Sequence, residues 1–144
     1  MHAQAHRLRI RHKVWLDAGG RFALGDGGVD LLRAIDETGS IRAAAQEIGW
    51  SYRHAIAYLD NADAVLSRPL VERARGGMAR GGAQLTQEGT RLVRCYGAFR
   101  ARLDVVFLRL TRPVVGALEI FAKTNATREV RERLRRSGPR RRSR

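Results

Sequence analysis

A run of hydrogen-bonding side chains near the middle of the sequence is suited to contacts with a nucleic acid. Ser51, Tyr52, Arg53 and His54 are consecutive, and Tyr58 follows about one helical turn later, on the side expected to face outward. A guanidinium group can bond O6 and N7 of guanine through two hydrogen bonds, so we expect Arg53 to read a base edge. The hydroxyl groups of Ser51 and Tyr52 can donate to phosphate oxygens, which fixes register without reading sequence. His54 is expected to contact either a base edge or a phosphate. An exposed histidine without a ligand is an equal alternative.

A second group of cations lies in a glycine-rich segment further along the chain. Arg73, Arg75 and Arg80 lie in or next to residues 74–82, which contain two pairs of glycines. Glycine allows a backbone to approach a ligand closely. We therefore expect these arginines to follow the backbone of a DNA duplex or to enter its minor groove. A solvated loop with no ligand is the alternative interpretation.

The overall charge points in the same direction. Lysine and arginine total 28 against 14 aspartates and glutamates, which gives a net charge of +14 over 144 residues. This excess favours a polyanionic partner, either a nucleic acid or an anionic membrane surface. Part of the charge lies in residues 128–144, which hold nine arginines, and residues 137–144 are expected to form a basic disordered tail.

Other compositional features narrow the class of protein. Cys95 is the only cysteine, so a disulfide within the chain is impossible, which fits a reducing cytoplasm. The sequence contains neither an apolar run near the length of a membrane span nor a signal peptide, so we expect no membrane contact. The spacing of histidines and acids suggests neither a metal site nor a catalytic set, and we predict no cofactor and no enzymatic activity.

Hydrophobic spacing and turn residues predict the elements that position these groups. Alternating apolar residues over 8–17, with a return at 22–24, predict a small β-hairpin. Apolar residues at helical spacing then predict three helices, with Gly39 ending the first. The first helix is expected between Asp26 and Gly39, and the next two at 41–48 and 52–67, with Asp26, Ser40 and Ser51 as the three N-caps.

Two short strands and a long helix are expected next. Residues 70–73 and 83–85 can pair as the strands of a basic β-hairpin around loop 74–82, and Thr86 can cap a helix over 87–111. Pro113 is expected to end that helix, which leaves 112–136 as a separate helical extension.

The long helix carries an apolar stripe at heptad spacing. A stripe of this kind packs either on the helix's own domain or on a second helix. We expect its first half to pack on the domain and its second half to form a homodimer. The stripe consists of Leu92, Tyr96, Phe99, Leu103, Val106 and Leu110.

The order of these elements predicts the fold. Two short helices joined by a glycine-containing turn, followed by a basic hairpin and a long helix, are typical of a winged helix-turn-helix. We predict a mainly α fold with small β-hairpins over residues 8–111, ending in a long dimerisation helix. The predicted function is sequence-specific binding of double-stranded DNA in the cytoplasm, to regulate transcription.

Two motifs resemble a known family. The segments LLRAIDETGSIRAAAQEIGWSYRHA and PLVERARGGMARGGAQLT, followed by a long helix containing EG, are similar to the N-terminal DNA-binding domain of the ModE family of molybdate-responsive transcriptional regulators. LysR-type regulators share GSIRAAA-like helices but not this wing. The resemblance implies that Ser51, Tyr52 and Arg53 face DNA, that 75–82 form the wing, and that the long helix dimerises. The residues after 111 are too few for the family's molybdate-binding domains, so we do not expect this chain to sense molybdate itself.

Two other classes of function compete with this interpretation. The basic tail also fits a non-specific architectural DNA-binding protein or an RNA-binding protein. The glycine-rich turn at 25–28 follows a strand and precedes a helix, as phosphate-binding loops of nucleotide-binding enzymes do. The lysine and hydroxyl residue that such a loop requires do not follow it, which disfavours the enzyme.

Overall fold

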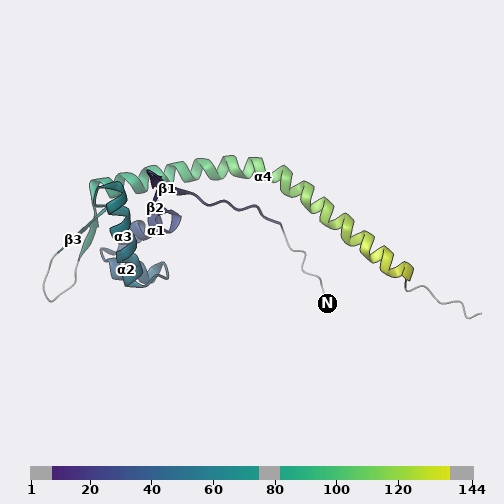
Figure 1. The fold of residues 1–144 in the computed structure, drawn as a ribbon, viewed down its shortest axis with the longest axis horizontal. Helices are drawn as coiled ribbons and strands as arrows, with labels where there is room; N and C mark the ends of the chain where they lie inside the picture. The colour runs from purple at the N-terminus through teal and green to yellow at the C-terminus, as the bar shows by residue number, and fades with distance from the viewer. Residues whose placement is uncertain (1–7, 75–81, 137–144) are drawn as a thin grey trace, which may run out of the picture. The chain divides into compact units, whose positions relative to one another are not determined.

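The structure, a computed structural model, describes residues 8–74 and 82–136. The chain divides into two compact units, one of His12–Arg102 and the other of Met1–Arg11 together with Leu103–Arg144. Its elements, drawn in Figure 1, are β1 (Trp15–Ala18), β2 (Arg21–Gly25), α1 (Asp26–Thr38), α2 (Ile41–Glu47), α3 (Tyr52–Leu66), β3 (Val71–Arg73), β4 (Ala83–Leu85) and α4 (Gln87–Arg136).

The unit His12–Arg102 is built around one hydrophobic core. Helices α1, α2 and α3 supply most of it, and the strands β3 and β4 add Val71 and Ala83. Leu92 and Val93, from the first part of α4, pack against this core and are partly buried. The unit is therefore a three-helix fold closed by a two-stranded hairpin. The largest fully buried side chains are Leu24, Val29, Leu31, Leu32, Ile35 and Leu59.

Local capping chemistry sets most of the helix boundaries, as predicted. The side chain of Ser40 accepts from the N–H of Ala43 at 3.3 Å, and that of Ser51 accepts from the N–H of His54 at 3.1 Å. Thr86 accepts from the third residue after it in the same way, at 3.0 Å. These bonds satisfy backbone donors that have no partner inside the helix. Three of the four predicted N-caps, Ser40, Ser51 and Thr86, are confirmed.

The predicted N-cap at Asp26 is wrong. Gly25 occupies that position without a side-chain cap, and Asp26 lies in the first turn of α1. Its Oδ1 atom accepts a 2.6 Å hydrogen bond from the hydroxyl of Tyr96 and forms a 3.3 Å ion pair with Nε of Arg100. The carboxylate is therefore engaged by two side chains of α4 instead of the backbone of α1.

The first hairpin is shorter and later than predicted. Strand β1 begins at Trp15 rather than at residue 8, and the pairing shifts between Leu16 and Asp17. Gly19 and Gly20 both have positive φ, +62° and +76°, as the two central residues of a tight hairpin turn require.

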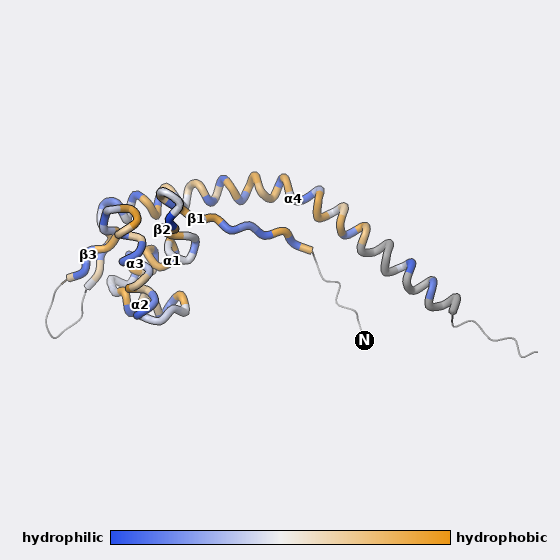
Figure 2. The backbone as a smooth tube through the Cα atoms, in the orientation of Figure 1, coloured by the Kyte–Doolittle hydropathy of each residue, from blue (hydrophilic) through white to orange (hydrophobic). Residues whose placement is uncertain are grey.

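Helix α4 passes through Pro113 and continues to Arg136, so the predicted end at 111 is wrong. A proline inside a helix removes one backbone N–H and crowds the carbonyl four residues earlier, which often bends a helix instead of ending it. Thr111 donates a 2.8 Å hydrogen bond to the carbonyl of Phe107 within the turn before the proline. In Figure 2, hydrophobic and hydrophilic residues alternate along α4.

The second unit contains the later part of α4 and the segment before β1. Leu8 and Ile10 line a groove together with Leu108 and Val115. Several apolar side chains of this part of α4 remain exposed to solvent, among them Leu110 and Leu118. No helix within residues 8–74 and 82–136 is long and apolar enough to cross a membrane.

A pair of glycine substitutions in α4 tests how closely this helix approaches the wing. A Cβ added at Gly89 would meet the carbonyl oxygen of Leu70, whereas one added at Gly116 would meet nothing. Gly89→Ala should lower the free energy of unfolding by about 1–3 kcal/mol, because backbone atoms must move. Gly116→Ala should raise it by about 0.5–1 kcal/mol, because alanine favours a helix. Urea unfolding followed by circular dichroism measures both, and an unchanged midpoint for Gly89→Ala would contradict this contact.

Candidate nucleic-acid interface

Helix α3 packs on the core through one face, and its first turn is exposed to solvent. Ala55, Leu59 and Ala62 are buried in the core and fix one face of the helix. The four residues that begin the helix and were predicted to contact DNA are exposed, and Tyr52 retains 43% of its accessible surface. This end of the helix can therefore enter a groove without rearrangement of the core. The four residues are Ser51, Tyr52, Arg53 and His54.

Tyr58 has a different position from the one that sequence reasoning gave it. Its ring is half-buried, and its hydroxyl accepts a 2.9 Å hydrogen bond from the backbone N–H of Gly25. A Cβ added at Gly28 would lie 2.7 Å from this hydroxyl, so α1 approaches the tyrosine closely. Burial raises the pKa of the Tyr58 hydroxyl, which keeps it neutral, although the bond from Gly25 lowers that pKa in part. Tyr58 therefore joins α3 to the start of α1, and its hydroxyl is already engaged by the backbone.

A cluster of aromatic side chains, Trp50, Tyr58 and Phe22, packs next to His54. The rings of Trp50 and His54 have centroids 4.4 Å apart, and those of Trp50 and Tyr58 are 5.0 Å apart. Phe22 of β2 meets Tyr58 edge-on at 5.9 Å. The sequence prediction omitted Trp50, although a tryptophan immediately before an N-cap serine is a signal that could have identified it. The cluster orients His54 at the edge of the open surface.

The base of the wing is attached to the helices on both sides. Strands β3 and β4 are antiparallel, with Arg73 opposite Ala83. The N–H of Ala83 donates to the carbonyl of Gly39 at 2.8 Å, and Nη2 of Arg73 pairs with Oδ1 of Asp60 on α3 at 2.7 Å. The wing therefore leaves the protein next to the exposed start of α3. Arg75 and Arg80 lie outside the described residues, as does the predicted tail over 137–144.

The arrangement of these elements agrees with a comparison against known families. Residues 28–90, from the first turn of α1 to the first turn of α4, match the family described as bacterial regulatory helix-turn-helix proteins of the lysR family. Residues 28–90 are therefore similar to the helix-turn-helix domain of this family. The match extends over β3 and β4, so it includes the wing strands that sequence analysis had set apart from LysR-type proteins.

Several curated relatives share this helix-turn-helix domain. The molybdenum-pterin-binding protein MopB of Rhodobacter capsulatus is 48% identical over 73 residues, which are 51% of this chain and 27% of MopB. The molybdenum transport protein ModE of Azotobacter vinelandii is 34% identical over 119 residues, 80% of this chain and 44% of that protein. The DNA-binding transcriptional dual regulator ModE of Escherichia coli (strain K12) is 40% identical over 68 residues, 47% of this chain and 26% of that protein.

These relatives confirm the predicted similarity to the ModE family. The chain spans less than half the length of each of the three. Their similarity therefore concerns the helix-turn-helix domain and its surroundings.

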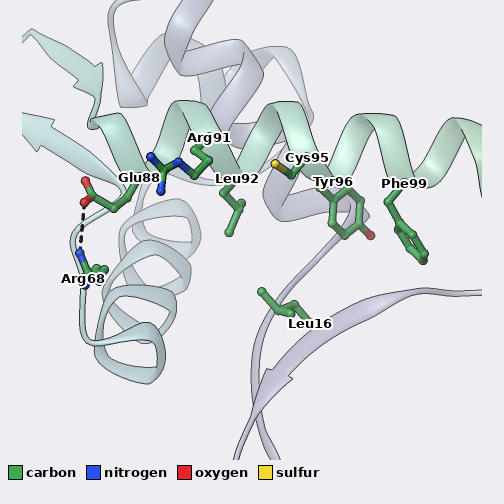
Figure 3. A pocket seen from close by; sticks show the side chains of 8 residues that line it. All are labelled: Leu16, Arg68, Glu88, Arg91, Leu92, Cys95, Tyr96 and Phe99. Carbon is green, nitrogen blue, oxygen red and sulfur yellow. Dashed lines mark hydrogen bonds and ion pairs between the residues drawn. The ribbon is translucent and has the colours of Figure 1, made fainter.

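The first part of α4 packs partly on the helix-turn-helix domain, as predicted for this half of the stripe. Leu92 and Tyr96 are partly buried against the core, and Phe99 is 50% exposed. The three point from α4 toward Leu16 of β1 and line a groove of about 650 Å³ (Figure 3). Burial, with the hydrogen bond to Asp26 as a second cause, raises the pKa of Tyr96 far above its usual range.

The opposite end of this groove is charged. Nη1 of Arg68 pairs with Oε1 of Glu88 at 3.2 Å, and Arg91 lies beside the pair (Figure 3). Cys95 is exposed on the groove wall. Among the residues that the structure describes, no group of three or more histidine, cysteine, aspartate or glutamate side chains could hold a metal ion.

The roles of the two tyrosines on α3 can be separated by removing their hydroxyl groups. Tyr58→Phe should lower the free energy of unfolding by about 0.5–1.5 kcal/mol, because the N–H of Gly25 loses its acceptor. It should leave the ratio of affinities for two DNA sequences unchanged. Tyr52→Phe, at an exposed position, should leave stability unchanged. Thermal unfolding combined with DNA titrations distinguishes the two, and a changed sequence preference in Tyr58→Phe would return this residue to the interface.

Proposed function

We propose that this chain is a sequence-specific DNA-binding regulator of transcription, with α3 in the major groove and the wing on the backbone or in the minor groove. The observation that carries the proposal is the exposed first turn of α3. The opposite face of this helix is buried in the core, and the base of the wing lies beside it. A major groove of B-DNA is wide enough to admit one α-helix. A regulator of bacterial genes works in the cytoplasm, and we infer that location.

In this proposal each exposed residue at the start of α3 has a separate task. Arg53 bonds guanine through both of its terminal nitrogens, which is worth about 1–3 kcal/mol of discrimination against another base. Ser51 and Tyr52 donate to phosphates, and these contacts set the register of the helix. His54, held by Trp50, lies next to Arg53 and contacts either the neighbouring base or its phosphate.

The net charge of +14 supplies attraction that does not depend on sequence. Each phosphate neutralised by a cation releases condensed counterions, so affinity falls as salt rises. In the proposed complex Arg75 and Arg80 of the wing loop add to this attraction. Such attraction also fits a non-specific DNA- or RNA-binding protein, which differs from a regulator in having no preferred duplex.

A substitution at Arg53 tests the assignment of base reading. After genome-wide selection of the preferred duplex, Arg53→Ala should reduce the ratio of specific to random affinity at physiological salt by about tenfold. The matched control is Arg33→Ala, which removes the same charge from the exposed face of α1. The control should leave the ratio unchanged.

Two results would contradict the proposal at different levels. An equal loss of affinity for all duplexes in Arg53→Ala would show that Arg53 contacts the backbone. A wild-type protein that binds its best duplex no more tightly than random duplex would favour the architectural alternative, since specific regulators gain about 10³-fold or more.

We further propose that the protein acts as a homodimer through the apolar stripe of α4. Val106 and Leu110 are 51% and 66% exposed, while Leu103 is half-buried. Exposed apolar side chains at heptad spacing are stabilised by packing against a second helix. A two-fold dimer would present two copies of α3 to successive major grooves, roughly 34 Å apart, and would bind a palindromic site.

The oligomeric state can be tested on one helix with a matched pair of variants. The double change Val106→Asp and Leu110→Asp should halve the molar mass measured by light scattering, because it places charges in the stripe. Ala101→Asp, on the opposite side of the heptad, should leave the mass of the dimer unchanged. A wild-type mass equal to that of one chain at micromolar concentration would refute the homodimer without affecting the assignment of Arg53.

A further inference from the structure

A hollow beside α3 has not yet been assigned a ligand. It has a volume of about 690 Å³ and opens between the α1–α2 turn, the first turn of α3 and the base of the wing. Ser40 lines it at the turn, Tyr52 at the start of α3, and Ala74 and Gly82 at the wing. The hollow is therefore bordered by both of the elements that the proposed function brings to DNA.

The charged side chains that line this hollow are two arginines. Arg42 comes from α2 and Arg73 from β3, and the described residues of the lining include no aspartate or glutamate. Arg73 uses Nη2 to pair with Asp60 on α3, at 2.7 Å. A guanidinium group has five N–H donors, so this pair leaves Arg73 able to bond a second acceptor. Two cations around an open hollow attract an anion.

The side chain of Arg42 is held in place by a ring. Its Cζ atom lies 4.5 Å from the centroid of the Tyr52 ring, a cation–π contact between α2 and α3. Stacking on an aromatic face orients the planar group while its N–H donors stay able to bond other acceptors. Ordering the arginine in advance reduces the entropy that a ligand must remove when it binds. Sequence analysis did not single out Arg42.

We propose that this hollow binds one sugar–phosphate unit of the DNA backbone, with the phosphate held by Arg42 and Arg73. The inference rests on the proposed function and deepens it. Arg42 then binds the backbone beside the base contact of Arg53, and its own contact carries no sequence information. A duplex backbone fits better than a free anion, since the lining joins Tyr52 at the start of α3 to Ala74 and Gly82 at the base of the wing, the two elements proposed to meet DNA.

The test compares backbone attraction with base reading in the full chain. Arg42→Ala should weaken binding about tenfold or more for the preferred and the random duplex alike, and should reduce the slope of log affinity against log salt by about 1 for each protomer bound. Arg42→Lys should fall between Arg42→Ala and the wild type, because it keeps the charge but loses the planar fork. Arg33→Ala, the control of equal charge change, should leave the slope unchanged.

A chemically altered duplex locates the contact. A neutral methylphosphonate is placed at each backbone position of the preferred duplex in turn, and affinities are measured for the wild type and for Arg42→Ala. At one position on each half-site the methylphosphonate should weaken the wild type about tenfold and leave Arg42→Ala unaffected. Additive losses at every position would overturn the proposal.

Further outcomes separate the failure of this inference from that of the function. If Arg42→Ala behaves like Arg33→Ala while Arg53→Ala loses its sequence preference, the phosphate site in the hollow is refuted. The proposal of a sequence-specific regulator is then unaffected. If the wild type prefers no duplex but the slope of its log affinity against log salt depends on Arg42, the phosphate site in the hollow is supported. The proposal of a sequence-specific regulator is then refuted. Arg42-dependent binding of inorganic phosphate with unchanged DNA affinity would mark a free-anion site and overturn the proposal.

Discussion

The hydrogen bond from the backbone of Gly25 to the hydroxyl of Tyr58 is the contact on which the arrangement of the helices depends. It joins the end of β2 and the start of α1 to the middle of α3. The adjacent residue, Asp26, accepts from Tyr96 and pairs with Arg100, so the same point also joins α1 to α4. Three helices that are distant in sequence therefore meet at two consecutive residues.

This junction explains why glycines are needed in the first turn of α1. Gly27 faces the ring of Trp50, and Gly28 faces Tyr58, each so closely that a Cβ would require a shift. The sequence suggested a phosphate-binding loop as one interpretation of these glycines. In the structure, the aromatic side chains of Trp50 and Tyr58 occupy the space beside these glycines. The glycines therefore allow close packing.

The wing is held by contacts of a different kind. Backbone hydrogen bonds tie Ala83 to Gly39 and Thr86 to Leu70, and the ion pair between Arg73 and Asp60 ties β3 to α3. Surface ion pairs contribute little to stability, about 0–1 kcal/mol. The pair is more useful as an orienting contact, because it directs an arginine of the wing toward the face of α3 that is proposed to meet DNA. Together these contacts hold the base of the wing beside α3, the two elements that are proposed to bind DNA.

The sequence by itself determined the features that depend on neighbours along the chain. Caps at Ser40, Ser51 and Thr86, and the left-handed residue Gly39, follow from bonds within four residues, so the helices before α4 could be placed closely. The exposed start of α3 followed from its apolar period. Only the tertiary structure decided that Tyr58 turns inward, because it lies next to Leu59 at the border of the buried stripe and periodicity cannot assign a border residue to a side.

The same limit applies to side chains whose partners are distant in sequence. The contacts of Asp26 with α4 and of Arg42 with Tyr52 bring residues of different elements together, and no local pattern encodes them. Pro113 was misjudged for a related reason, since a proline removes one hydrogen bond while the turns on both sides of it keep theirs. Local rules identified where elements begin, whereas packing between elements decided which side chains stay exposed, because those contacts join residues that are distant in sequence.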